Sequence, residues 1–173
     1  MKKIYLDQAS TSCPKAPGVA EAVFRYLSND AVNINRGSYD SAFSVEEQIF
    51  ETREQLKQLF HFPDKSRNVI FTANVTSSLN ILLKGILRPG DHVLVSSMEH
   101  NAVMRPLVQL SHTGISFDRV PCDTFGNLLL DQAETLIRPN TRLFVCLHGS
   151  NVCGTLMPVK KIGDFCKKHR ILF

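Results

Sequence analysis

Residues 68–100 read NVIFTANVTSSLNILLKGILRPGDHVLVSSMEH, and this stretch decides the fold. An apolar run at 69–71 predicts a buried strand, and apolar residues at helical spacing over 76–86 predict a helix. A Pro-Gly-Asp turn at 89–91 then precedes a second predicted strand at 92–96. The order strand, helix, turn, strand is typical of parallel strands joined by a crossover helix.

The same alternation continues to the end of the chain. It predicts further strands and helices, with strands at 115–120 and 142–147 and helices at 101–112, 132–137 and 159–169. We therefore expect an α/β fold with a mainly parallel sheet and flanking helices. The apolar residues 171–173 predict the beginning of a fifth strand, so we expect the domain to be incomplete at its C-terminus.

The chain before residue 68 carries a helical pattern. Apolar residues at helical spacing predict helices at 18–27 and 44–60. No internal repeat or low-complexity stretch divides the sequence. We therefore predict an N-terminal arm at 1–15, followed by one domain over 16–173.

Two pairs of polar residues have the spacing of a helix capping box. In this motif a serine, threonine or aspartate precedes a glutamate by three positions, and each side chain binds a backbone N–H group of the first turn. Ser44 and Glu47 fit the helix predicted at 44–60, and Asp131 and Glu134 fit the later one. Both pairs predict where a helix begins.

Composition places the chain among ordinary globular proteins. Of its 173 residues 43% are hydrophobic and 21% are charged, and the formal net charge is +4. The basic residues are spread along the chain, so a nucleic-acid surface is not favoured. The five cysteines include no C-x-x-C pair, which favours reduced thiols over disulfides or a zinc site. With neither a signal peptide nor a long apolar stretch, we expect a cytoplasmic protein without a membrane segment.

Three polar loops follow predicted strands, at 72–76, 96–101 and 147–154. Ligands of parallel sheets bind beyond the carboxyl ends of the strands, so the loops could converge on one anionic, aromatic ligand. Taken singly, each loop has a simpler explanation: a helix cap at the first, a surface or capping histidine at the second, and a glycine-bounded turn at the third. Neither G-x-G-x-x-G after the first strand nor a Walker A motif occurs, so a dinucleotide or nucleoside triphosphate is not favoured.

Five ordered motifs resemble one known family. They are IYLDQAST at 4–11, NRGSYD at 35–40, FTANVTSSLN at 71–80, MEHNAVMRPL at 98–107 and HGSNVCGTLMPV at 148–159. Together they resemble the cysteine desulfurase and selenocysteine lyase group of class V aminotransferases, which use pyridoxal 5'-phosphate. The resemblance covers almost the whole chain. It implies the N-terminal portion of a fold type I large domain.

The resemblance also implies roles for individual residues. Asn74, Val75 and Thr76 match the turn that holds the cofactor phosphate, which agrees with the affinity of helix N-termini for anions. His100 matches the histidine that stacks on the pyridine ring and serves in proton transfer, and so is the catalytic candidate. Asn151 matches the asparagine that binds the phenolic oxygen of the ring.

Further residues resemble segments that approach the substrate. Gln8 and Ala9 belong to the first motif, although the family often has Ala-Ala where this chain has Ala9-Ser10. Arg36 resembles part of a loop near the active site at a dimer interface, and an ordinary surface arginine is an equally good interpretation.

The family's reaction removes sulfur from L-cysteine and gives alanine and an enzyme persulfide. It needs a lysine that holds the cofactor as a Schiff base, an aspartate at the pyridine nitrogen, a nucleophilic cysteine and an arginine for the substrate carboxylate. All four are expected beyond Phe173, and the family does not require a cysteine at Cys153. We therefore expect the isolated chain to be inactive and to bind pyridoxal phosphate weakly at most.

Partners and alternatives follow from the same resemblance. It implies an amino-acid substrate, a homodimer in the full-length protein and a sulfur-acceptor protein. A selenocysteine lyase or another class V aminotransferase is the first alternative. A non-catalytic binding or dimerisation fragment is the second, and an unrelated α/β binding domain is the third.

Overall fold

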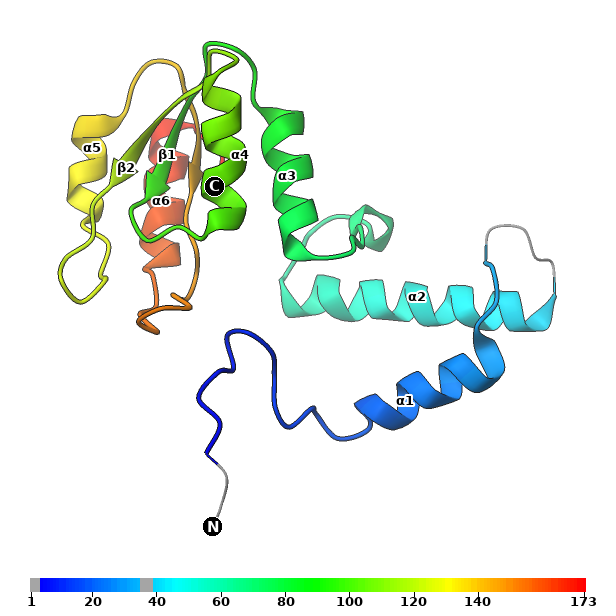
Figure 1. Cartoon of the computed structure of the whole chain (residues 1–173). Helices are drawn as coiled ribbons and strands as arrows, with labels where there is room; N and C mark the ends of the chain where they lie inside the picture. Colours follow the sequence, from blue (N-terminus) through cyan, green and yellow to red (C-terminus); the bar gives the residue numbers. More distant parts are fainter. Residues whose placement is uncertain (1–3, 35–38) are drawn as a thin grey trace. The chain divides into compact units, whose positions relative to one another are not determined.

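The computed structural model describes residues 4–34 and 39–173. The chain divides into two compact units, Met1–Phe71 and Thr72–Phe173 (Figure 1). The described part of the first unit is helical, and the second unit contains a parallel sheet with helices on its faces. Among the helices of these residues, none combines the length and the apolar character that a membrane crossing requires.

The first unit contains four helical segments in its described residues: α1 (Val19–Arg25), the π-helix η1 (Tyr26–Asp30), α2 (Asp40–Leu59) and the 3-10 helix η2 (Ser66–Asn68). α2 begins earlier than predicted, and no side chain caps its amino end. The predicted capping box of Ser44 and Glu47 is therefore wrong, because both residues lie inside the helix. Asp40 in the first turn places a negative charge at the positive end of the helix dipole instead.

The strand predicted at 69–71 is also wrong. The backbone N–H of Val69 donates to the Ser66 carbonyl at 2.9 Å and closes the turn of η2. The side chains of Ile70 and Phe71 are 72% and 48% exposed. An apolar run becomes a strand only where a neighbouring strand pairs with its backbone, and no such strand exists in the described residues of this unit.

The second unit is built on the strands β1 (His92–Ser96), β2 (Ser116–Val120) and β3 (Thr141–Val145). Their order is β2-β1-β3, and both pairings are parallel. β1 lies in the centre, where Leu94 is in register with Asp118 on one side and Phe144 on the other. The predicted mainly parallel sheet is confirmed.

Helices cover both faces of this sheet, with α3 (Val75–Ile86) and α4 (Asn101–Ser111) on one face and α5 (Ala133–Leu136) and α6 (Val159–His169) on the other (Figure 1). Strand side chains alternate between faces, so Val93 and Val95 pack with Leu107 of α4 while Leu94 packs with Ile162 of α6. All five side chains are completely buried. Two apolar layers therefore hold the sheet in place.

The amino end of α5 differs from the prediction. Asp131 lies in a 3-10 turn, η3 (Leu130–Gln132), and the residue before α5 makes no side-chain cap. The carboxylate of Glu134 instead contacts His169 Nε2 of α6 at 2.9 Å and accepts a hydrogen bond from Lys168. The predicted capping box of Asp131 and Glu134 is therefore wrong, because the glutamate binds a neighbouring helix.

Residues 171–173 make the first contacts of a strand without forming one. The Phe144 N–H donates to the Leu172 carbonyl at 2.9 Å, and the Leu172 N–H donates to the Arg142 carbonyl at 3.0 Å. Leu172 thereby forms a single parallel bridge with Leu143 of β3. The position beside the sheet agrees with the prediction, and the regular fifth strand does not form within these three residues.

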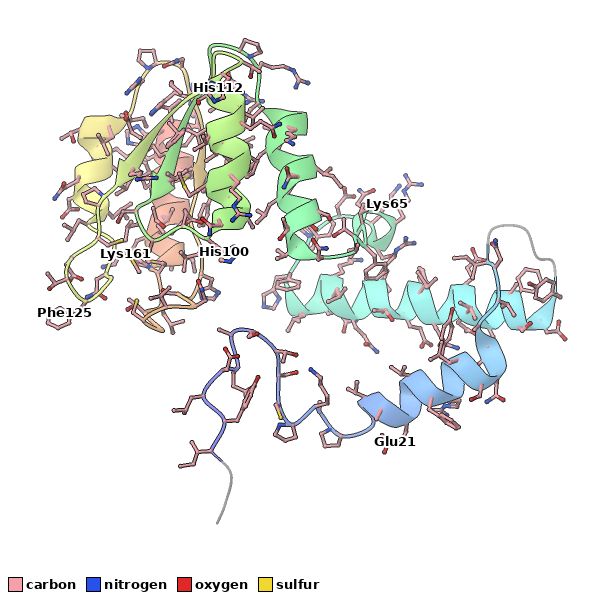
Figure 2. All side chains as sticks on the ribbon, viewed as in Figure 1. Glu21, Lys65, His100, His112, Phe125 and Lys161 are labelled. Atoms are coloured by element: carbon pink, nitrogen blue, oxygen red, sulfur yellow. The ribbon has the colours of Figure 1, made fainter. Side chains whose placement is uncertain are left out.

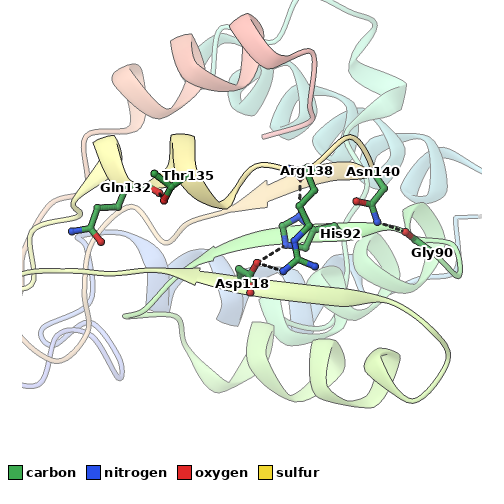
Figure 3. A network of polar contacts seen from close by, with 8 residues as sticks. Gly90, His92, Asp118, Gln132, Thr135, Arg138 and Asn140 are labelled. Carbon is green, nitrogen blue, oxygen red and sulfur yellow. Dashed lines mark hydrogen bonds and ion pairs between the residues drawn. The ribbon is translucent and has the colours of Figure 1, made fainter.

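A polar network joins the three strands near the amino ends of β1 and β3 (Figure 3). His92 of β1 is completely buried, and its Nδ1 lies 2.8 Å from the Thr141 hydroxyl of β3. Its Nε2 lies 3.3 Å from Asp118 of β2, without the alignment of a hydrogen bond. Asp118 also pairs with Arg138. Burial, followed by the Arg138 charge, lowers the pKa of His92, and Asp118 opposes that shift.

Candidate functional site

The candidate site lies in the second unit, where α3 and α4 begin beyond the carboxyl end of β1. It is a pocket of about 470 Å³. It is lined by side chains of two helices: Thr76 and Asn80 of α3, and His100, Asn101, Ala102, Arg105, Pro106 and Gln109 along α4. The size is typical of a small-molecule site. The position agrees with the rule that ligands of parallel sheets bind beyond the carboxyl ends of the strands.

The amino end of α3 is organised by Asn74. Its Oδ1 accepts hydrogen bonds from the Ser77 N–H at 2.9 Å and the Ser77 hydroxyl at 3.1 Å. Thr72 supports the turn by donating to the Asn74 carbonyl at 2.9 Å. The capping interpretation of this loop is therefore confirmed for Asn74. The N–H groups of Val75 and Thr76, the first residues of α3, have no carbonyl acceptor within the helix and are suited to bind an anion.

His100 occupies the amino end of α4 and is exposed at the pocket (Figure 2). Its Nδ1 accepts a hydrogen bond from the Ala102 N–H at 3.0 Å. A neutral imidazole that accepts at Nδ1 carries its proton on Nε2. The cap therefore fixes both the orientation of the ring and the nitrogen that is left for a ligand.

Glu99 is a residue of the site region that the sequence interpretation missed. Its Oε1 accepts hydrogen bonds from the Ser96 hydroxyl at 2.6 Å and from the Leu147 N–H at 2.7 Å. It thus joins the carboxyl end of β1 to that of β3, directly beside His100. Burial raises the pKa of Glu99, and the two hydrogen bonds and the nearby His100 oppose the rise. A carboxylate three residues after an apolar strand was the available signal.

The loop after β3 is held by hydrogen bonds to Ser150. The buried Ser150 hydroxyl accepts from the N–H groups of Val152 and Cys153 at 3.2 and 3.3 Å. The Thr155 hydroxyl lies 3.2 Å from Cys153 Sγ. Hydrogen bonds with Ser150 and Thr155 lower the pKa of the exposed Cys153 thiol to about 7. The loop therefore carries a thiol that is partly ionised near neutral pH.

The structure brings only some of the predicted site residues together. Thr76 and His100 line one pocket, and Asn74 and Val75 lie beside it at the start of α3. Asn151 is exposed and does not line the pocket. The roles assigned to these residues remain predictions.

The residues predicted to approach the substrate belong to the first unit. The Gln8 side chain donates to the Cys13 carbonyl at 2.8 Å and accepts from the Cys13 N–H at 3.1 Å, so it folds the arm on itself. Ala9 is exposed in the same turn. Arg36 lies outside the described residues. Proximity of these three residues to a substrate stays a prediction.

Comparison with known proteins identifies relatives over the whole chain. The family described as aminotransferase class-V matches residues 4–173. Cysteine desulfurase IscS of Actinobacillus succinogenes is 34% identical over 178 residues, covering 98% of this chain and 43% of the relative. IscS of Vibrio vulnificus is 31% identical over 176 residues with the same coverage. The chain therefore spans less than half the length of these relatives.

Solved structures give the same result for the fold. The apo structure of cysteine desulfurase from Thermococcus onnurineus NA1 has a TM-score of 0.87 at 27% identity and covers 98% of this chain and 42% of its own. The structure of SspA in complex with cysteine has a TM-score of 0.84 at 27% identity, covering 96% of this chain and 48% of its own. Both similarities agree with part of a fold type I domain.

Proposed function

The chain belongs to the class-V aminotransferase family, and we propose that it forms the N-terminal part of the cofactor-binding domain of a cysteine desulfurase-like enzyme. The observation that carries this proposal is the pocket that both Thr76 and His100 line at the amino ends of two helices. A phosphate-bearing aromatic cofactor needs an anion site and a flat stacking surface, which the amino end of α3 and the His100 ring would supply.

The lining residues fit pyridoxal phosphate as the cofactor. None of them is acidic, so the phosphate would meet no like charge. The N–H groups of Val75 and Thr76 and the Thr76 hydroxyl would hold the phosphate, since they lie at the positive end of α3. His100 would offer its ring face to the pyridine ring. When bound, the cofactor withdraws electrons from the α-carbon of an amino-acid substrate.

The cap of α4 determines how His100 could take part in proton transfer. Its Nδ1 is occupied by the Ala102 N–H, so Nε2 is the atom that can give or take a proton. Asn151 would bind the phenolic oxygen of the ring. Its loop is tied at Ser150, which sets where the asparagine can reach.

The substrate proposed is L-cysteine, whose sulfur is removed to leave alanine and an enzyme persulfide. IscS proteins are named as cysteine desulfurases, and the similar SspA structure contains cysteine. In the complete enzyme we propose a cytoplasmic homodimer that passes sulfur to an acceptor protein. Gln8, Ala9 and Arg36 would lie near the substrate in that assembly. The 173-residue polypeptide by itself is expected not to desulfurate cysteine, because none of its lysines matches the family's cofactor lysine.

Binding of pyridoxal phosphate to the 173-residue polypeptide tests the proposal. We expect weak, reversible binding in equilibrium dialysis that Thr76→Val and His100→Ala each reduce. His112→Ala is the matched control, because His112 is exposed at the opposite end of α4 (Figure 2). Equal losses in the control and the site variants would contradict the site. A stable visible absorbance band that borohydride abolishes would show a lysine Schiff base within residues 1–173 and overturn the expectation of weak, reversible binding.

A further inference from the structure

The pocket between α3 and α4 extends past the residues that the proposed cofactor uses. Along α4 its lining continues from His100 to Arg105 and then to Gln109. A rise of 1.5 Å per residue puts Arg105 about 7.5 Å along the helix axis from His100, and Gln109 about one turn further. A ligand group held at the amino ends of the helices would therefore leave this stretch of the pocket free.

The chemistry of this end of the pocket favours an oxyanion. Arg105 is exposed and makes no ion pair with the residues that the structure describes. Its guanidinium presents paired N–H donors that match the two oxygens of a carboxylate or phosphate. Gln109, one turn further along α4, adds an amide donor to the same lining. Asn80 of α3 lines the same pocket, and its Nδ2 donates to the Thr76 carbonyl at 3.0 Å.

We propose that Arg105 and Gln109 form an oxyanion subsite in this pocket, separate from the phosphate position at the amino end of α3. The inference rests on the proposed function for that phosphate position. The ligand is a small molecule bearing a carboxylate or phosphate group. Arg105 supplies the charge, and the absence of acidic lining residues lets the anion approach without repulsion.

A competing explanation is that Arg105 is a solvated surface arginine without a ligand. Arg105 lines the pocket, whereas Arg119 is exposed on β2 and does not line it. Arg119→Gln is therefore the matched control for Arg105→Gln. Both variants remove one exposed positive charge, so a general change in net charge affects them equally.

The experiment uses the isotope-labelled 173-residue chain and follows nuclear magnetic resonance signals at constant ionic strength. Inorganic phosphate and acetate are titrated separately, and the two arms decide between a phosphate and a carboxylate ligand. We expect the Arg105 Nε–H signal to shift, and Arg105→Gln to weaken binding of the preferred anion about tenfold, as loss of a charge-assisted hydrogen bond predicts. Arg119→Gln should leave the affinity unchanged.

Two results would overturn the subsite. One is equal anion affinity in Arg105→Gln and the parent chain. The other is a phosphate titration in which the Val75 and Thr76 amides move together with Arg105 at a single affinity, which would join Arg105 to the phosphate position. Failure of the proposed function can be distinguished from failure of the oxyanion subsite. In that case pyridoxal phosphate binding is independent of Thr76 and His100, whereas anion binding still depends on Arg105.

Discussion

Two thiols near the end of β3 lie in opposite environments. Burial raises the pKa of Cys146 to about 12, and the nearby Glu99 charge adds to the rise. In the exposed loop, hydrogen bonds with Ser150 and then Thr155 lower the pKa of Cys153 to about 7. Because the thiolate is the nucleophile, these two residues should differ strongly in reactivity.

Alkylation with iodoacetamide tests this difference at the level of single residues. We expect the rate at Cys153 to rise with pH to a midpoint near the pKa of about 7, because the thiolate fraction increases through that value. Cys146 should remain unmodified in the folded chain. Peptide mapping by mass spectrometry separates the two from the exposed Cys13. Thr155→Val should move the midpoint upward, and an unchanged midpoint would show that this hydrogen bond does not stabilise the thiolate.

Residues of the candidate site could be predicted where their role depends on local sequence. His100 follows the apolar strand β1, and Thr76 lies in the first turn of the helix before that strand, so their position at one end of the layer follows from the alternation of elements. Glu99 binds Leu147, which lies 48 residues away in the sequence, and Arg105 matters only because α3 packs beside α4. Such roles depend on contacts between distant elements, and no local pattern contains them.

Glu99 makes a connection between two elements, because its carboxylate accepts hydrogen bonds at the ends of both β1 and β3. Glu99→Ala leaves the Ser96 hydroxyl and the Leu147 N–H without that acceptor, which should lower the free energy of unfolding by about 1–3 kcal/mol. Glu99→Gln keeps an Oε1 acceptor and is the matched control. Urea denaturation measures both variants, and equal stability of Glu99→Ala and the parent chain would exclude this connection as a source of stability.

Helices and strands could be predicted where the spacing of apolar residues along the sequence matches the side of the element that packs in the core. The predictions for α3, α4, α6 and the three strands are confirmed to within a few residues. In each case the apolar face of a helix packs against apolar side chains of the strands. The capping box at Ser44 fails because α2 already begins at Asp40. The one at Asp131 fails because Glu134 binds α6 instead. The run at 69–71 fails because strand formation requires a partner that its own sequence does not specify.

At the scale of the whole second unit, the three strands share the buried network around His92. The Thr141 hydroxyl accepts a hydrogen bond from the Arg138 N–H at 2.7 Å and lies 2.8 Å from His92 Nδ1. His92 Nε2 faces the Asp118 carboxylate at 3.3 Å. A second proton would place a charge in a site from which water is excluded, beside Arg138. The stability of the unit should therefore depend on pH through this residue.

The sign follows from the lowered pKa of His92. Below the ordinary value of 6.5, the unfolded chain binds a proton that the folded chain does not, so the free energy of unfolding falls as pH falls. The slope should be on the order of 1 kcal/mol per pH unit until the folded pKa is reached. Urea denaturation between about pH 5 and pH 8 measures it, bracketing the ordinary histidine pKa.

His92→Gln removes the titrating group and should flatten this dependence, whatever its effect on stability at pH 8. His112→Gln is the matched control, because His112 is exposed and lies outside the network. Asp118 stays beside Arg138 in both variants, so a remaining slope in His92→Gln would assign the pH dependence to other groups. Equal slopes in all three proteins would show that the network tolerates a charged imidazole, and that the three strands do not depend on the neutral form of His92.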